Sequence, residues 1–121
     1  MKEKKPLIIV YMDDEPDLCE IFSDYFSSEQ VQVLTFSKPD EALSSIKTNP
    51  PDLIFLDYQL PGTTGDLIAH EIVKILTFPV PIYLVTGNLE VKTDFIFDKK
   101  FEKPMKSSDI QEIIDNYTQK T

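Results

Sequence analysis

The sequence predicts an α/β protein with a doubly wound parallel sheet, and three observations indicate this fold class. Short apolar runs typical of buried strands alternate about five times with amphipathic segments of helical period. The connections between these segments are short, and turn residues mark their ends. The run 53–57 has four apolar residues followed by a carboxylate, as expected for a strand that is buried on both faces in the middle of a parallel sheet.

The predicted strands share one property, since most of them end in a polar or charged residue. The run 53–57 ends at Asp57, and Pro61-Gly62 then forces a loop. The first strand ends at Asp13, and the fourth ends at Thr86. The predicted strands are 7–12, 31–36, 53–57, 82–85 and a segment near 99–103.

Helical segments with one apolar side fill the intervals between the strands. Ser37, with Asp40 three positions later, resembles a capping box that opens the second helix. Gly65 opens the third helix, and Ser107 or Ser108 is expected to cap the last one. The apolar side of the first helix is predicted to be Leu18, Ile21, Phe22 and Tyr25.

Composition indicates one soluble domain, 1–121. A net charge of −9 argues against binding to nucleic acid or to anionic lipid, and it suits a basic partner or a divalent cation. Cys19 is the single cysteine, so no internal disulfide can form. No apolar run approaches the roughly 20 residues of a membrane span, and the charged N-terminus lacks the features of a signal peptide. We therefore expect a cytoplasmic protein with no membrane partner.

Parallel strands place their carboxyl ends at one edge of the sheet, where ligands bind in open α/β folds. Three carboxylates, from Asp13, Asp14 and Asp57, would repel one another there and attract a proton or a cation. Mg²⁺ prefers such oxygen ligands. Because neighbouring strand residues point to opposite faces, Asp13 and Asp14 can face one ion only if the chain leaves the strand between them.

Beside a cation, Asp57 has a defined chemistry, because a carboxylate can attack phosphorus and form an acyl phosphate. The cation and Lys103 would neutralise charge on the phosphoryl oxygens, and Thr86 could donate a hydrogen bond to one of them. With three glycines in all, the chain has neither a P-loop nor a dinucleotide fingerprint.

The motifs that follow the predicted strands are Asp13-Asp14, Asp57, Leu60-Pro61-Gly62 with Gly65 behind it, Thr86 and Lys103-Pro104. Together they resemble the receiver domain of bacterial two-component response regulators, of the single-domain chemotaxis-regulator type, over essentially the whole chain. The resemblance implies a flavodoxin-like sheet of five parallel strands in the order 2-1-3-4-5. Because the fifth helix ends the sequence, we expect a stand-alone receiver.

The resemblance also implies a phosphorelay function. A histidine kinase or a histidine phosphotransfer protein would transfer a phosphoryl group to Asp57, and the change would alter binding of a downstream protein partner. Such a domain is not an enzyme, since it assists only its own Mg²⁺-dependent phosphorylation and dephosphorylation.

Site residues carry over position by position from this resemblance. Mg²⁺, or Mn²⁺ as a second candidate, would be held by the side chains of Asp13, Asp14 and Asp57 and by the backbone carbonyl of Gln59. Thr86 and Lys103 would read the phosphate. Lys103-Pro104 is expected to be a cis peptide, and the positions that tune phosphate lifetime are Gln59 and Asn88.

The interval between Thr86 and Lys103 departs from the family pattern, because it spans only 17 positions. A loop, a helix, a second loop and a strand hardly fit there. We therefore expect helix 4 to be shortened or missing, with 95–97 filling its place against the sheet. The aromatic switch position of the family is Lys100 here, so we expect the signal to leave by another face or by movement of 88–98.

Two alternatives have different chemistry. A phosphorylation-independent pseudo-receiver would bind partners only. A phosphohydrolase of the haloacid-dehalogenase-like kind needs a second aspartate two residues after the first, and Gln59 stands at that position. His70 is expected to be a surface or packing residue rather than a metal ligand, and Tyr11 a packing residue of its strand.

Overall fold

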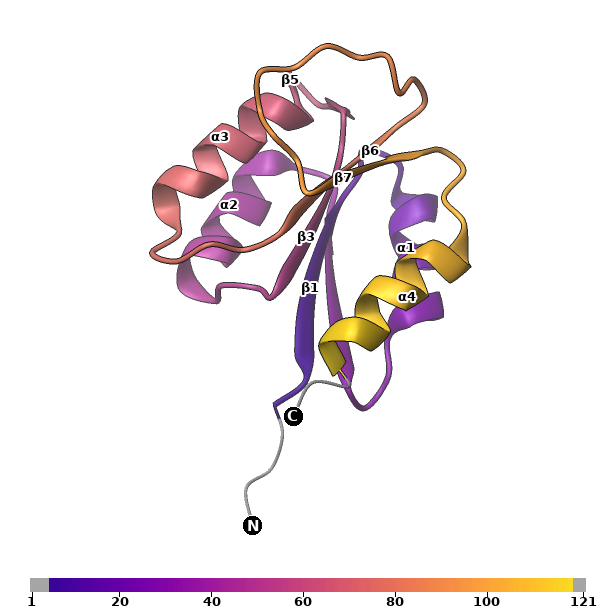
Figure 1. Cartoon of the computed structure of the whole chain (residues 1–121). Helices are drawn as coiled ribbons and strands as arrows, with labels where there is room; N and C mark the ends of the chain where they lie inside the picture. The colour runs from indigo at the N-terminus through magenta and orange to yellow at the C-terminus, as the bar shows by residue number, and fades with distance from the viewer. Residues whose placement is uncertain (1–4, 119–121) are drawn as a thin grey trace.

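Five parallel strands form the central sheet in the spatial order β2-β1-β3-β6-β7 (Figure 1). The computed structural model describes residues 5–118, so residues 1–4 and 119–121 of the predicted domain 1–121 lie outside the described residues. Counted among themselves, the sheet strands have the order 2-1-3-4-5, and the predicted flavodoxin-like fold is confirmed. The strands are β1 (Leu7–Met12), β2 (Val31–Phe36), β3 (Leu53–Asp57), β6 (Ile82–Thr86) and β7 (Lys99–Glu102).

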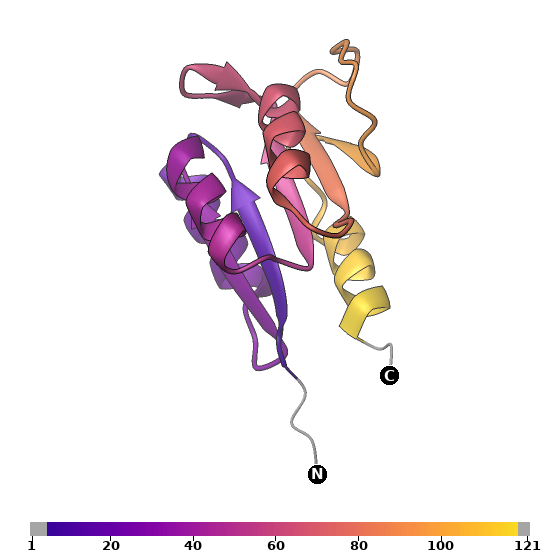
Figure 2. The ribbon, with the colours of Figure 1, turned by 90° about the vertical axis from the view of Figure 1, so that its left-hand side faces the viewer.

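Two helices cover each face of the sheet (Figures 1 and 2). The pair α1 (Pro16–Phe26) and α4 (Ser107–Thr118) packs on one face, and the pair α2 (Pro39–Thr48) and α3 (Gly65–Ile75) packs on the other. Strand residues alternate between the two cores, because successive side chains point to opposite faces. Tyr11 and Phe55 therefore lie on the α1 and α4 side, whereas Val10 lies on the α2 and α3 side.

The apolar side of α1 differs from the prediction. Cys19, Phe22 and Phe26 are buried, whereas Ile21 and Tyr25 are each 61% exposed. The apolar stripe of this helix is wider than the surface that contacts the sheet. Ile21 and Tyr25 lie at the margin of the stripe and are exposed to solvent near α4.

The predicted caps of two helices are wrong. Pro39 takes the first position of α2, where its fixed φ suits a helix start, and Lys38 is the N-cap, so Ser37 does not cap the helix. The last helix begins at Ser107 itself, and the backbone carbonyl of Lys106 accepts the hydrogen bond from the Ile110 amide. The α2 helix therefore begins two residues after the suggested cap Ser37, and α4 begins at the suggested cap Ser107 rather than after it.

Two connections near the carboxyl ends of the strands have their own structure. The predicted loop after Asp57 contains a short antiparallel hairpin of β4 (Gln59–Leu60) and β5 (Thr63–Thr64), with Gly62 at a positive φ of 73° in its turn. Residues 88–98 form no helix, as predicted for helix 4.

Within 88–98, Phe95 and Phe97 pack against the core on the α3 side. Ile96 is 92% exposed, so the prediction that it fills the place of the helix is wrong. Neighbouring side chains of an extended chain point in opposite directions, which leaves Ile96 outside when its two neighbours pack inward.

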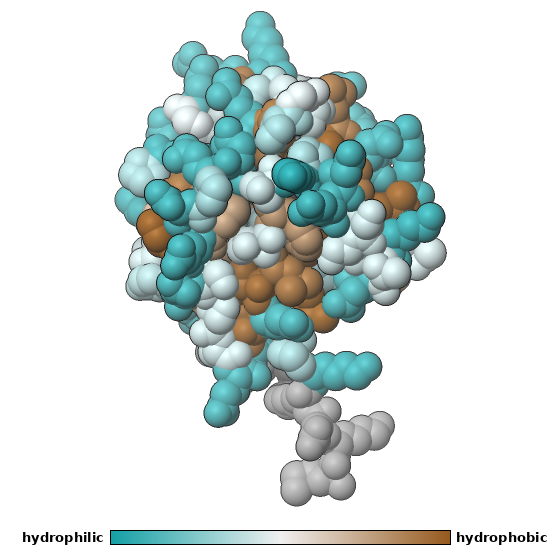
Figure 3. Space-filling view, turned by 180° about the vertical axis from the view of Figure 1, so that it is seen from behind, coloured by the Kyte–Doolittle hydropathy of each residue, from teal (hydrophilic) through white to brown (hydrophobic). Residues whose placement is uncertain are grey.

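The hairpin and 88–98 lie at the end of the molecule where the strands of the sheet end, opposite the end at which β1 begins (Figures 1 and 2). The face seen from behind is mostly hydrophilic, with apolar residues gathered near its centre (Figure 3). Among the described residues, no helix is long and apolar enough to cross a membrane.

Candidate functional site

The carboxyl ends of three strands bring the predicted carboxylates together. Asp57 is the last residue of β3, and Asp13 and Asp14 directly follow β1. One carboxylate oxygen from each of the three lies within 4.8 Å of the others. The strand ends before Asp13, so Asp13 and Asp14 can face the same point, as the sequence required. Asp13 and Asp57 are buried, and Asp14 is exposed.

Lys103 reaches both buried carboxylates from the end of β7. Its Nζ lies 3.0 Å from Asp13 Oδ2 and 3.1 Å from Asp57 Oδ2. The peptide bond between Lys103 and Pro104 is cis, as expected. The amide of Lys103 donates to the carbonyl of Thr86, which continues the pairing of β6 and β7 up to the site. The lysine is therefore anchored to the sheet through its backbone while its side chain spans the two acids.

Burial and charge separate the acidities of the two buried acids. Burial, together with the charges of Asp13 and Asp14, raises the pKa of Asp57 to about 6, although Lys103 opposes the change. Burial also acts to raise the pKa of Asp13, but hydrogen bonds from Tyr11, the Glu15 amide and Lys103 outweigh it, and the pKa is lowered. Burial acts to lower the pKa of Lys103, whereas its hydrogen bonds and charge interactions with Asp13 and Asp57 act to raise it. Together they raise the pKa of Lys103. The site thus holds more negative charge than its lysine balances.

Tyr11 is a site residue that the sequence analysis assigned to packing alone. Its hydroxyl donates a hydrogen bond of 2.7 Å to Asp13 Oδ2, and the backbone amide of Glu15 donates one of 3.0 Å to Asp13 Oδ1. A period of two places Tyr11 and Asp13 on the same side of the chain, and this was the signal that could have found the contact.

Thr86 ends β6 beside the acids, but its hydroxyl makes local contacts. It accepts a hydrogen bond of 3.1 Å from the amide of Asn88 and donates one of 3.2 Å to the carbonyl of the same residue. Gln59 and Asn88 line a cavity of about 410 Å³ together with Asp14, Asp57, Thr86 and Lys103. The structure therefore places the predicted site residues around one cavity, except for Asp13, which is fully buried beside Asp57 and Lys103.

The donor set fits a hard divalent cation. Three carboxylates converge on the single ammonium group of Lys103, so part of their negative charge is left unbalanced. Mg²⁺ binds through one or two carboxylates plus phosphate oxygens and waters, and the cavity leaves room for these ligands. His70 lies apart from this group, as predicted, with its Nε2 3.0 Å from Asp94 Oδ1 and its ring edge-on to Phe95.

The family model of the response regulator receiver domain matches residues 9–115, which include all of these acids and Lys103. This chain belongs to the response regulator receiver domain family. Receiver domains bind Mg²⁺ at an acidic pocket, and the three-carboxylate cluster described above is the corresponding feature of this member.

Solved structures of receiver domains have the same fold. The CheY-like receiver domain from Methylobacillus flagellatus superposes with a TM-score of 0.83 at 19% identity, over 93% of this chain and 98% of that one. The response regulator TrrA from Thermotoga maritima, solved in complex with Mg²⁺-BeF, has a TM-score of 0.78 at 26% identity, over 91% of this chain and 97% of that one.

Relatives with longer chains are regulators of transcription. The transcriptional regulatory protein BaeR of Escherichia coli is 35% identical over 88 residues, which cover 73% of this receiver and 35% of BaeR. The phosphate regulon transcriptional regulatory protein PhoB of Pseudomonas aeruginosa is 30% identical over 103 residues, which cover 77% of this receiver and 45% of PhoB. This receiver spans less than half the length of both relatives.

Proposed function

We propose that this receiver accepts a phosphoryl group on Asp57 from a histidine kinase or a histidine phosphotransfer protein, and that the transfer changes its binding to a downstream protein. The observation that carries the proposal is the buried Asp57 carboxylate at a strand end, beside two further carboxylates and 3.1 Å from Lys103. The Mg²⁺-BeF complex of TrrA supports a cation and a phosphoryl-like group at the matching site.

In the proposed reaction, a carboxylate oxygen of Asp57 attacks phosphorus, and the bond from phosphorus to the donor nitrogen breaks. Lys103 turns from the carboxylates to the phosphoryl oxygens and neutralises part of their charge. Asp13, Asp14, Asp57 and the carbonyl of Gln59 would hold Mg²⁺, with Mn²⁺ as a second candidate. When bound, the cation supplies further neutralisation of the phosphoryl oxygens.

We propose that Thr86 passes the change to 88–98. Its hydroxyl must release the carbonyl of Asn88 before it can donate to a phosphoryl oxygen. Contacts with α3 hold the segment beyond Asn88, including the pair of His70 with Asp94. One end of 88–98 therefore lies at the proposed phosphorylation site, and another part of it packs on α3, where a partner could bind it.

Amide chemical shifts test this movement. With beryllofluoride and Mg²⁺ bound, the amides of 88–98 should shift relative to the Mg²⁺-bound protein, and those of the α2 C-terminal turn should not. Identical shifts throughout 88–98 would exclude this segment as the output of the site.

The rest of the proposal concerns reaction class and compartment. Gln59 stands where an aspartyl phosphohydrolase needs a general acid, so we propose that the receiver is not an enzyme and turns over only its own phosphoryl group. The acidic composition argues against a nucleic-acid partner. The thiol of Cys19 is free and buried, which suits a reducing compartment such as the cytoplasm.

Incubation with acetyl phosphate and Mg²⁺, followed by intact-mass measurement, tests the phosphoacceptor role. The receiver should gain one phosphoryl group, and Asp57→Asn should gain none. No label on the unmodified receiver, either from acetyl phosphate or from a panel of phosphorylated histidine kinases, would favour a phosphorylation-independent pseudo-receiver. Repeated turnover of small phosphate esters would instead indicate a phosphohydrolase.

A further inference from the structure

We propose that Tyr11 is a positioning residue of the phosphorylation site, whose hydroxyl holds the Asp13 carboxylate in place so that Lys103 can leave it for the phosphoryl group. The inference rests on the proposed function, and it assigns a role to a residue of the β1 core.

The contacts of Asp13 divide into fixed and movable donors. Asp13 Oδ2 accepts from Tyr11 at 2.7 Å and from Lys103 Nζ at 3.0 Å, and Asp13 Oδ1 accepts from the amide of Glu15 at 3.0 Å. The carboxylate is fully buried. Lys103 is a long side chain that is 22% exposed, and Asp57 Oδ2 is a second partner for it. It is therefore the donor that can move.

Tyr11 cannot move in the same way. Its ring is 1% exposed and stacks on Phe22, with ring centroids 4.2 Å apart and planes 4° from parallel. Its backbone lies in β1, between β2 and β3. A tyrosine side chain has two torsions, and this packing restricts both. The hydroxyl is therefore a standing donor to Asp13 Oδ2.

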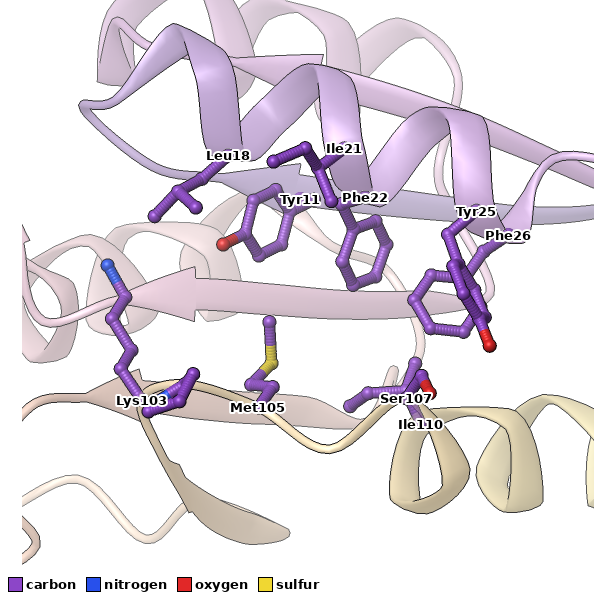
Figure 4. A pocket seen from close by; sticks show the side chains of 11 residues that line it. Tyr11, Leu18, Ile21, Phe22, Tyr25, Phe26, Lys103, Met105, Ser107 and Ile110 are labelled. Atoms are coloured by element: carbon purple, nitrogen blue, oxygen red, sulfur yellow. The ribbon is translucent and has the colours of Figure 1, made fainter.

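The cavity between α1 and α4 brings Tyr11 and Lys103 together. Both residues line this cavity of about 420 Å³, and the Tyr11 hydroxyl and the Lys103 amino group point toward the same end of it (Figure 4). Lys103 also lines the cavity of about 410 Å³ at the carboxylates, so its side chain borders open space on the side of Tyr11 and on the side of Asp57.

Without the Tyr11 hydroxyl, the transfer of Lys103 to a phosphoryl oxygen would leave the buried Asp13 Oδ2 with no hydrogen-bond donor, and only the proposed cation, which Asp14 and Asp57 share, would balance its charge. Loss of both donors to a buried acceptor is unfavourable, and more so when the acceptor is charged. Tyr11→Phe should therefore keep Lys103 on Asp13 and weaken every state in which Lys103 binds the phosphoryl group.

Beryllofluoride binding, followed by ¹⁹F NMR, provides the test. Each protein is titrated at an Mg²⁺ concentration that saturates it, and circular dichroism establishes that it is folded. The Kd of beryllofluoride should rise about tenfold in Tyr11→Phe, since one hydrogen bond to a charged group contributes on that order.

Tyr83→Phe is the matched control. Tyr83 is a buried tyrosine of the same core, stacked on Phe55, and its hydroxyl is on the side of Tyr117 and away from Asp13. Its Kd should stay within twofold of the unmodified receiver. The proposed role of Tyr11 would be overturned, with the proposed function left standing, by either of two results. One is a Kd of Tyr11→Phe within twofold of that of the unmodified receiver, and the other is an equal rise of Kd in both variants. No beryllofluoride binding to the unmodified receiver would overturn the proposed function as well.

A second measurement uses the unmodified receiver with ¹³Cζ-labelled tyrosine. When beryllofluoride displaces Lys103 from Asp13, Tyr11 becomes the single donor to Asp13 Oδ2, and its Cζ resonance should shift more than that of Tyr83. An unmoved Tyr11 resonance in a sample whose ¹⁹F spectrum shows bound beryllofluoride would contradict the inference.

Discussion

At the residue scale, Lys103 balances two buried acids by itself, since the ion pairs that the described residues give to Asp13 and Asp57 both come from it. Removing one partner of a buried pair leaves charge without compensation, which is more destabilising than losing a pair on the surface. The stability of the unliganded receiver should therefore depend strongly on this one side chain.

Lys103→Met should lower the free energy of unfolding at neutral pH by about 3 kcal/mol, because it leaves two buried carboxylates facing each other. Urea denaturation without divalent cations measures the change. Lys74→Met is the control, since Lys74 and its partner Glu71 are 72% and 54% exposed. That variant should change stability by less than about 0.5 kcal/mol. Equal effects of the two substitutions would show that the site lysine has no special role in the fold.

The raised pKa of Asp57 predicts a pH dependence with a definite sign. The folded receiver binds this proton up to about pH 6, whereas the unfolded chain releases it near its ordinary value of 3.8. Ionisation of Asp57 therefore lowers stability as the pH rises from about 4 to about 6.

Asp57→Asn removes this ionisation. The variant should be more stable than the unmodified receiver by about 3 kcal/mol at pH 7.5, and nearly equal to it at pH 4. Chemical denaturation across this range, with a chelator present, measures both curves. A stability difference that stays constant from pH 4 to pH 7.5 would mean that the pKa of Asp57 is not raised in the fold.

Sequence reasoning at this scale predicted that the carboxylates converge, because Asp13-Asp14 and Asp57 stand at the ends of apolar strands, and it placed Lys103 with them as the end of the predicted fifth strand. It could not show that the Thr86 hydroxyl contacts Asn88 rather than the acids, because that choice depends on a side-chain torsion and a local loop. It also missed the contact between Tyr11 and Asp13. Packing alone explains an aromatic ring in an apolar strand. The hydrogen bond from the Tyr11 hydroxyl depends on how the chain places the Asp13 carboxylate after β1 ends at Met12.

At the scale of elements, Gly65 sets how closely α3 approaches the end of β3. A Cβ at this position would meet the backbone carbonyl oxygen of Asp57 well inside van der Waals contact. The amide of Gly65 also donates to the carbonyl of Tyr58 at 2.6 Å. The absence of a side chain thus lets α3 start directly behind the end of β3, where Asp57 lies.

Gly65→Ala should destabilise the receiver by about 2 kcal/mol, because backbone atoms must shift to relieve the overlap. Thermal or urea unfolding measures the loss. Gly87→Ala is the control, since a Cβ there would meet no atom within 4 Å and the residue has no positive φ. That variant should unfold within about 0.5 kcal/mol of the unmodified receiver. Similar losses at both glycines would contradict the close approach of α3.

The strands β1, β3 and β6 were predictable because continuous apolar runs between turn residues have few other structures in a chain of this length, whereas the mostly charged β7 followed from the alternation of strands and helices. Helix starts were less predictable, because two signals for the start of α2 stand close together. Ser37 is a possible N-cap, but the fixed φ of Pro39 suits the first helical position, and the helix begins there. The missing helix was predictable from the length of 88–98, but the outward direction of Ile96 was not. Length limits which elements fit, whereas packing decides which side chain points inward.

At the scale of the whole molecule, acidic groups outnumber basic ones, with a net charge of −9, and three of the acids converge at the site. A ligand that binds only the folded state stabilises it by mass action. Millimolar Mg²⁺ should therefore raise the Tm by several degrees for a domain of this size. Scanning calorimetry at constant ionic strength separates this effect from general screening.

Asp14→Asn is the matched control for the cation effect. Asp14 is exposed, so its substitution should leave the fold in place while it removes one carboxylate from the cluster. The rise in Tm with Mg²⁺ should then shrink or disappear. An equal rise in both proteins would show that Mg²⁺ acts elsewhere on the acidic surface.

The contact between Asp13 and Lys103 joins positions that lie 90 residues apart in the chain. It connects the end of the first strand to the end of the last one, across two intervening strands, β3, which ends in Asp57, and β6. The pocket of the three carboxylates and Lys103 is therefore complete only when most of the polypeptide is in register, because its charged groups come from both ends of the described chain. The proposed labelling of Asp57 thus requires the complete fold, and a truncated or misassembled copy of this protein should not be labelled.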